Sequence, residues 1–200
     1  MAIKVANNQS LTAITALPAA VSGGAMTLLE TQTASSSATI SFTSGIDSTY
    51  DEYVFKFINI HPATDSTAFQ VNFRDGGSSY DATKTTTYVL CKHLEDASGA
   101  ELSYKTGLDL AQSTAVQKLT VDVDNANDAS QSGELTLFSP SSTTFIKHFM
   151  SRVQTMQTNS GSMENYVSGY CNVTAAIDGV QFSMSSGNID AGTFKLYGVS

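Results

Sequence analysis

Clustered side-chain oxygens in one short segment give the first candidate for chemistry. Asp122, Asp124, Asn127 and Asp128 lie close together in sequence, and oxygen ligands in a loop are what Ca²⁺ prefers. The spacing departs from that of an EF-hand, because Ala126 interrupts the acidic run and no glycine occupies the sixth position. We therefore interpret the segment as a polar loop between strands and keep its four oxygen-bearing residues as a candidate Ca²⁺ site.

Residues that commonly catalyse reactions do not form a recognisable pattern. His61, His93 and His148 are far apart, and none has another histidine or a cysteine at the spacing of zinc ligands. No G-x-S-x-G segment marks a nucleophilic serine. The acidic residues fall mostly in turns, where carboxylates are solvated, and do not suggest the facing pair of a glycosidase. We expect no catalytic residue, no cofactor and no enzymatic activity.

The two cysteines, Cys91 and Cys171, each lie inside an apolar, strand-like run. In such a setting a free thiol acts as a small hydrophobic side chain. A disulfide between them stays open, because the sequence does not place the two side chains relative to each other.

The composition excludes several classes of protein. Charged residues make up 14% of the 200 residues, whereas about 25% is usual. The net charge is −8 and the ten Lys and Arg residues are scattered, so no basic surface for nucleic acid is expected. No apolar run approaches the ~18 residues of a membrane span, so we expect no membrane insertion.

Alternation of apolar and polar residues with a period of two recurs along the chain. It is clear at 69–73, 119–123 and 180–184, and glycine-rich or polar turns separate such runs. The run 53–60 is apolar on both parities, which predicts a strand buried on both faces. Only residues 108–116 offer a helical turn or two, so some ten or eleven strands must pair mainly antiparallel.

These strands predict an all-β fold, an antiparallel β-sandwich of jelly-roll type with an extended N-terminal arm. An immunoglobulin-like sandwich is the nearest alternative, but the chain has no tryptophan for the Cys-Trp-Cys signature. The arm covers residues 1–24 and ends in Ser22-Gly23-Gly24, and residues 25–200 form a single β-sandwich domain. Apolar residues of the arm are expected to dock on a partner; they are Ile3, Val5, Leu11, Ile14, Leu17 and Val21.

Tyrosines are the candidate contacts with a receptor, because a ring with one wet end suits an interface or a sugar. Five are expected in loops or near strand ends: Tyr50, Tyr80, Tyr88, Tyr104 and Tyr166. Of these, Tyr80 and Tyr104 are the predicted receptor contacts, with a glycan of a host surface as the partner.

Three segments carry a resemblance to a known class. They are residues 3–18 (IKVANNQSLTAITALP), residues 43–62 (TSGIDSTYDEYVFKFINIHP) and residues 185–198 (SSGNIDAGTFKLYG). The sequence resembles structural proteins of tailed bacteriophages of marine bacteria such as cyanobacteria. The resemblance implies a component of the virion surface that contacts other virion proteins. It transfers no catalytic residue.

Two positions on the particle compete. The preferred hypothesis is a tail-associated or fibre-like protein that is fixed by its arm and faces the host. The alternative is a head decoration protein that joins capsid subunits, and a carbohydrate-binding β-sandwich module is a further alternative. A homotrimer is expected in either virion role, because identical subunits commonly close into symmetric rings.

Deletion of residues 1–24 tests the docking arm. We expect a folded body that no longer joins the particle, because a bound arm of ~20 residues could bury several hundred Å². Circular dichroism checks the fold, and quantitative mass spectrometry of purified particles checks incorporation. Incorporation of the truncated chain at full occupancy would show that the arm does not attach it.

Overall fold

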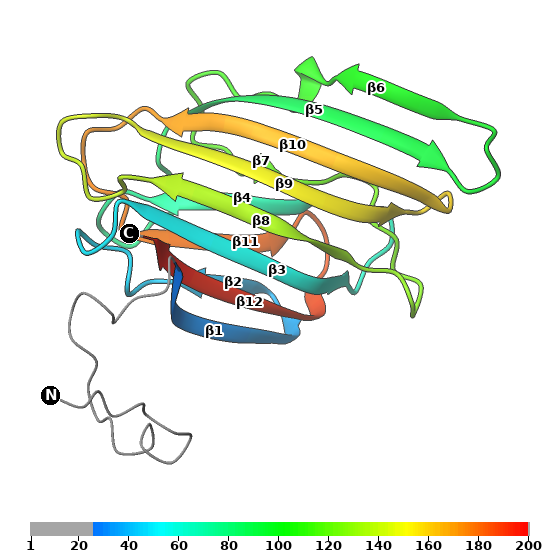
Figure 1. Cartoon of the computed structure of the whole chain (residues 1–200), viewed down its shortest axis with the longest axis horizontal. Coiled ribbons are helices and arrows are strands. Elements are labelled where there is room, and N and C mark those ends of the chain that lie inside the picture. The colour runs from blue at the N-terminus through cyan, green and yellow to red at the C-terminus, as the bar shows by residue number, and fades with distance from the viewer. Residues whose placement is uncertain (1–25, 200) are drawn as a thin grey trace, which may run out of the picture.

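The computed structural model describes residues 26–199, which form two antiparallel sheets that pack face to face (Figure 1). The larger sheet has the strand order β1-β12-β3-β8-β9-β10-β5-β6, and the smaller has the order β2-β11-β4-β7. Strand bounds are Met26–Ser37 (β1), Thr39–Phe42 (β2), Glu52–Pro62 (β3), Phe69–Arg74 (β4), Lys84–Leu94 (β5), Ala100–Tyr104 (β6), Gln117–Lys118 (β7), Gln131–Phe138 (β8), Lys147–Gln157 (β9), Gly161–Cys171 (β10), Gly179–Met184 (β11) and Ile189–Val199 (β12). The predicted all-β antiparallel sandwich is confirmed, whereas the predicted arm at 1–24 lies outside the described residues.

Aromatic side chains fill the space between the sheets. Phe182 of β11 lies at the centre, with its ring centroid 5.0 Å from that of Phe57 and 5.6 Å from that of Phe194 on the opposite sheet. On its own sheet Phe182 stacks on Phe69 at 5.7 Å. All four side chains are at most 1% exposed. Most ring pairs meet edge to face, the arrangement that the aromatic quadrupole favours. Contacts between phenylalanine rings therefore hold the two sheets together.

The strand β3 does not behave as its residue pattern predicts. Ile58 is 41% exposed, whereas Ile60 is fully buried beside the core residue Phe57. The pairing with β8 shifts between Phe57 and Ile60, and Asn59 has a positive φ of 51°. This bulge inserts an extra residue and moves Ile60 onto the core face. The prediction that the strand is buried on both faces is therefore wrong over its second half, although Val54 is buried on the outer side.

The larger sheet has more strands than the smaller one, and buried polar pairs lie on the inner side of β5 and β10. Thr86 donates a hydrogen bond to Gln117 at 2.6 Å, and Tyr88 donates one to Asn165 at 2.6 Å, all four side chains being buried. The segment that follows β6, including a 3-10 turn at Thr106–Leu108, lies against this side. Because Gln117 belongs to β7 of the smaller sheet, its bond with Thr86 joins the two sheets, and pairing of this kind satisfies the buried polar groups of this region.

Within the described residues helix is confined to that short turn at 106–108, and the helical turns expected at 108–116 do not form. Between residues 26 and 199 there is no helix with the length and apolar character needed to cross a membrane.

Truncation of the central ring tests the role of the aromatic core. We expect Phe182→Ala to lower the free energy of unfolding by about 3–5 kcal/mol, because it leaves a cavity among five rings. The matched control is Phe145→Ala, whose ring is 73% exposed and whose loss should cost no more than about 0.5 kcal/mol. Urea unfolding measures both, and Phe182→Leu serves if the alanine variant does not fold. Equal losses for Phe182 and Phe145 would contradict this account of the core.

Candidate functional site

The outer face of the larger sheet carries a row of side chains that crosses all eight strands. The registers of neighbouring strands place its members directly opposite one another. In strand order they are Thr31, Lys195, Lys56, Glu134, Arg152, Tyr166, Val89 and Tyr104. We call this set the outer row. The first four members of the row are polar or charged, whereas the last four include two tyrosines, Tyr166 and Tyr104. The face therefore has a charged part and an aromatic part.

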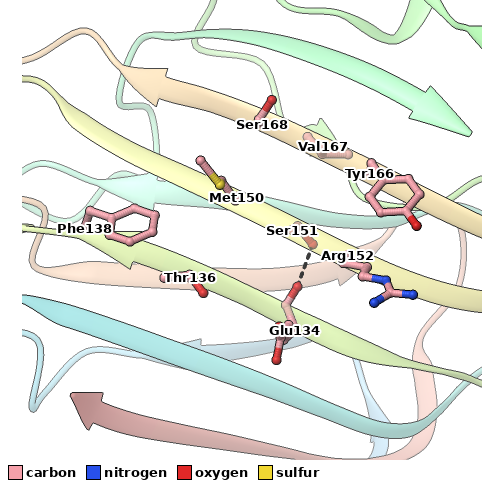
Figure 2. A pocket seen from close by; sticks show the side chains of 9 residues that line it. All are labelled: Glu134, Thr136, Phe138, Met150, Ser151, Arg152, Tyr166, Val167 and Ser168. Carbon is pink, nitrogen blue, oxygen red and sulfur yellow. Dashed lines mark hydrogen bonds between the residues drawn. The ribbon is translucent and has the colours of Figure 1, made fainter.

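A hollow of about 440 Å³ lies on this face, centred on β9 (Figure 2). Met150 and Tyr166 form its apolar part and are 58% and 42% exposed. Glu134 and Arg152 border it on one side and Ser168 on the other, and all of these residues come from β8, β9 and β10. Apolar atoms next to hydrogen-bonding groups in one open hollow are suited to a small or extended polar ligand.

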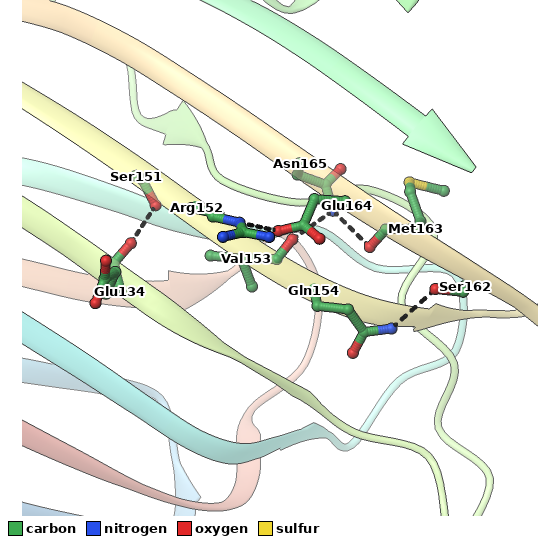
Figure 3. Close-up of polar contacts among 9 residues, drawn as sticks. All are labelled: Glu134, Ser151, Arg152, Val153, Gln154, Ser162, Met163, Glu164 and Asn165. Carbon is green, nitrogen blue, oxygen red and sulfur yellow. Dashed lines mark hydrogen bonds and ion pairs between the residues drawn. The ribbon is translucent and has the colours of Figure 1, made fainter. Parts of the chain in front are cut away.

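Arg152 contacts two neighbouring side chains of this surface, Glu164 and Tyr166. Its Nε donates a hydrogen bond of 2.5 Å to Oε1 of Glu164 (Figure 3), and its guanidinium carbon lies 5.7 Å from the ring centroid of Tyr166. The bond to Glu164 raises the pKa of Arg152 further above its ordinary value. Glu164 thus holds the guanidinium group of Arg152 in place, and this group restricts the ring of Tyr166 on one side.

Close approach of two strands brings the charged groups together. Gly133 precedes Glu134 in β8, and a Cβ at Gly133 would lie 2.2 Å from the carbonyl oxygen of Arg152. Only glycine allows β8 and β9 to come this close. On the next strand Lys56 forms an ion pair with Glu134, so charge alternates along this part of the outer row.

Further hollows continue along the same face. One of about 310 Å³ includes Met150, His148 and Tyr170. The rings of His148 and Tyr170 pack edge to face at a centroid separation of 6.1 Å. Another of about 350 Å³ lies over the ion pairs of Lys56 and Arg152. The outer face is therefore an extended contact surface with several shallow depressions.

The two predicted receptor tyrosines occupy different places. Tyr104 is 54% exposed at the end of the outer row, and its hydroxyl donates a hydrogen bond to Asp109. That bond raises the pKa of the Tyr104 phenol. Tyr80 instead follows β4, where the guanidinium carbon of Arg74 lies 5.8 Å from its ring centroid. The register places Tyr104, and not Tyr80, in the same row as Tyr166.

Other expectations for tyrosines are corrected. Tyr166 was expected near a loop or strand end, but it lies in the middle of β10. Tyr88, which had the same expectation, lies within β5 and is fully buried, and its hydroxyl donates a hydrogen bond to Asn165. A strand was expected from Tyr166 to Val173, whereas β10 begins five residues earlier, at Gly161, and ends at Cys171.

One side-chain oxygen of the candidate Ca²⁺ segment is engaged in a turn. Asp124 accepts the backbone N–H of Ala126 at 2.7 Å, which stabilises a turn. Asn127 and Asp128 border a separate polar hollow beside His61. Within residues 26–199 no group of three or more His, Cys, Asp or Glu side chains is placed to hold a metal ion, so Asp122, Asp124 and Asp128 do not form such a group.

The three histidines are separate. His61 lies 3.6 Å from Asp190, from Nδ1 to Oδ2, and His93 and His148 are exposed on β5 and β9.

Both cysteines are free: Cys171 is buried, whereas Cys91 is half-buried on the outer face of β5.

A second row, on the inner face, places two lysines beside a thiol. Cys171 of β10 lies directly opposite Lys84 of β5 and Lys147 of β9, and all three are buried. Lys84 Nζ donates to Asn72 Oδ1 at 2.5 Å and to Ala82 O at 2.8 Å. We call these three residues the buried lysine row; its lysines were missed because the sequence gives no sign that a lysine side chain turns inward.

Burial controls the protonation of this row. It lowers the pKa of Lys84 to about 8 and lowers that of Lys147. It also raises the pKa of Cys171 to about 12. A thiol with so high a pKa is a poor nucleophile near neutral pH. Lys147 Nζ donates to the carbonyls of Val173 and Ala175 at 3.0 and 2.6 Å, so both lysines hold neighbouring loops in place.

Comparison with known proteins identifies no relative. No protein-family model matches the chain, and no curated protein matches it with significant similarity.

The predicted docking residues lie outside the described residues; they are Ile3, Val5, Leu11, Ile14, Leu17 and Val21.

The buried lysine row predicts an unusual dependence of stability on pH. Because Lys84 has a folded-state pKa near 8, below its ordinary 10.5, the folded state binds fewer protons and stability rises with pH. Cys171 opposes this above about pH 9, because its thiol ionises first in the unfolded chain. We expect a net gain of about 1 kcal/mol between pH 7.5 and pH 9 in urea unfolding.

Lys84→Met should abolish most of this gain, whereas the control Lys118→Met, which changes a half-buried lysine of β7, should retain it. An equal pH dependence in the wild type and Lys84→Met would show that Lys84 is not the titrating group.

Proposed function

We propose that this chain is a non-enzymatic structural protein of a bacteriophage particle, surface-exposed and tail-associated, that acts by contact through the outer face of its larger sheet. The observation that carries the proposal is the strand order. The order β1-β12-β3-β8 within the larger sheet and the order β2-β11-β4-β7 of the smaller sheet correspond to the two four-stranded sheets of a jelly roll, and β1 to β4 alternate between the two sheets. We infer that this is a jelly roll, with hairpin strands inserted after β4 and after β8.

Jelly rolls serve both as viral coat domains and as lectins. The fold therefore supports a role in contact and recognition but does not choose between these two classes. The resemblance of residues 43–62 and 185–198 to structural proteins of marine phages favours the virion. In the described part, both segments contribute strands, β3 and β12, that lie side by side in the larger sheet.

The outer face supports a position facing the host. Met150, Tyr166 and Tyr104 are each more than 40% exposed on it, and exposed apolar groups that lie together commonly mark a binding surface. A head decoration protein would instead bury such a face against the capsid. We propose a homotrimer as the form in the particle, since repeated display of one face strengthens individually weak contacts.

The number of copies per particle tests this proposal. Quantitative mass spectrometry of purified particles, calibrated on the major capsid protein, should give between a few and a few tens of copies. Absence from purified particles would refute the virion role. A count in the hundreds, near one per capsid subunit, would refute the tail and identify a decoration protein.

A further inference from the structure

We propose that the aromatic half of the outer row, formed by Arg152, Tyr166, Val89 and Tyr104, binds an uncharged, extended glycan of the host surface. The inference rests on the proposed function, because it names the partner of the exposed face. It differs from the sequence-based expectation in its residues, since Tyr166 takes the place of Tyr80.

The spacing of the two rings favours a linear sugar chain. Tyr166 lies opposite Val89, and Val89 lies opposite Tyr104, so the rings stand on one line two strands apart. Neighbouring strands are about 4.8 Å apart, which separates the two side chains by about 10 Å. Two linked pyranose rings span a comparable length, and the small Val89 between the tyrosines leaves room for the chain to cross β5.

Both rings are held before a ligand arrives. Arg152, which is itself bonded to Glu164, lies beside the ring of Tyr166. The Tyr104 hydroxyl donates to Asp109. Since each ring is anchored through a polar contact, little side-chain entropy remains to be lost on binding.

Polar groups beside the rings suit hydroxyl groups. The hollow next to Tyr166 includes Thr136, Ser168 and Glu134, which together donate and accept hydrogen bonds. A sugar presents apolar C–H faces and hydroxyl edges, so it matches a surface where aromatic and polar groups alternate.

Charge favours a neutral ligand. Arg152 is the charged member of this half of the row and is paired with Glu164, which offsets its attraction for a polyanion. The chain has a net charge of −8, which repels anionic polymers at long range. An uncharged glycan avoids this repulsion.

Affinity electrophoresis of the full-length chain through gels that contain a neutral polysaccharide tests the inference. The probes are hydroxyethylcellulose, laminarin and mannan, and dextran sulfate is the anionic comparison. We expect retardation by at least one neutral probe and none by dextran sulfate. Tyr166→Ala and Tyr104→Ala should each weaken binding about tenfold, and Tyr166→Phe, which keeps the ring, should stay within about twofold of the wild type.

The matched control is Tyr80→Ala, a tyrosine outside the row, which should leave binding unchanged. Urea unfolding of each variant separates lost binding from lost folding. Binding that Tyr80→Ala weakens as much as Tyr166→Ala would place the site elsewhere. Retardation by none of the neutral probes, or by dextran sulfate alone, would refute the inference.

Sedimentation of the wild type and Tyr166→Ala completes the test. An unchanged association state is expected, whereas dissociation of an oligomer by Tyr166→Ala would assign the face to a second copy of this chain. The copy number per particle is measured independently, so failure of glycan binding does not affect the test of the virion role.

Discussion

Packing of the phenylalanine rings between the two sheets is the interaction on which the rest of the structure depends. Phe182 contacts rings from both sheets, including Phe57 on β3 and Phe194 on β12. Each buried ring contributes a few kcal/mol from removal of its apolar surface from water. Because side chains alternate along a strand, burial of Phe194 on the inner face directs Lys195 outward. The core therefore determines which residues the outer face can present.

The outer row is a consequence of register as well as of alternation. Arg152 and Tyr166 are opposite each other because β9 and β10 form a hairpin whose turn lies at 158–160. A shift of one residue in that register would turn the side chains of one of the two strands to the opposite face, so Arg152 and Tyr166 would no longer lie together on the outer face. The bulge at Asn59 shows how the chain limits such a shift, since the extra residue is absorbed within β3 and the pairing of Lys56 with Glu134 is kept.

Local pattern in the sequence predicts most of the strands, although residues 119–123, which alternate in the same way, follow the short β7 as bends and one isolated bridge. Phe69, Val71 and Phe73 alternate with polar residues, and all three are buried as expected. It does not predict which strands are neighbours, because Val89 and Tyr166 are far apart in the chain and meet only through pairing. The strand Met26–Ser37 was also not predicted, because most of its residues are polar and it forms an edge of the sheet.

The division of the outer row between two sets of strands explains how one fold can combine a stable core with a separate contact surface. Its charged half comes from β1, β12, β3 and β8, the strands of the larger sheet that we assign to the jelly roll. Its aromatic half comes from β9, β10, β5 and β6, the inserted strands. The inner side of these strands joins the core through contacts such as that of Phe149 with Phe73 of the smaller sheet, and it also holds buried polar pairs such as Tyr88 with Asn165. Substitutions at Tyr166 or Tyr104 should therefore have little effect on the phenylalanine core, so the contact surface that we propose can change while the framework that positions it is kept.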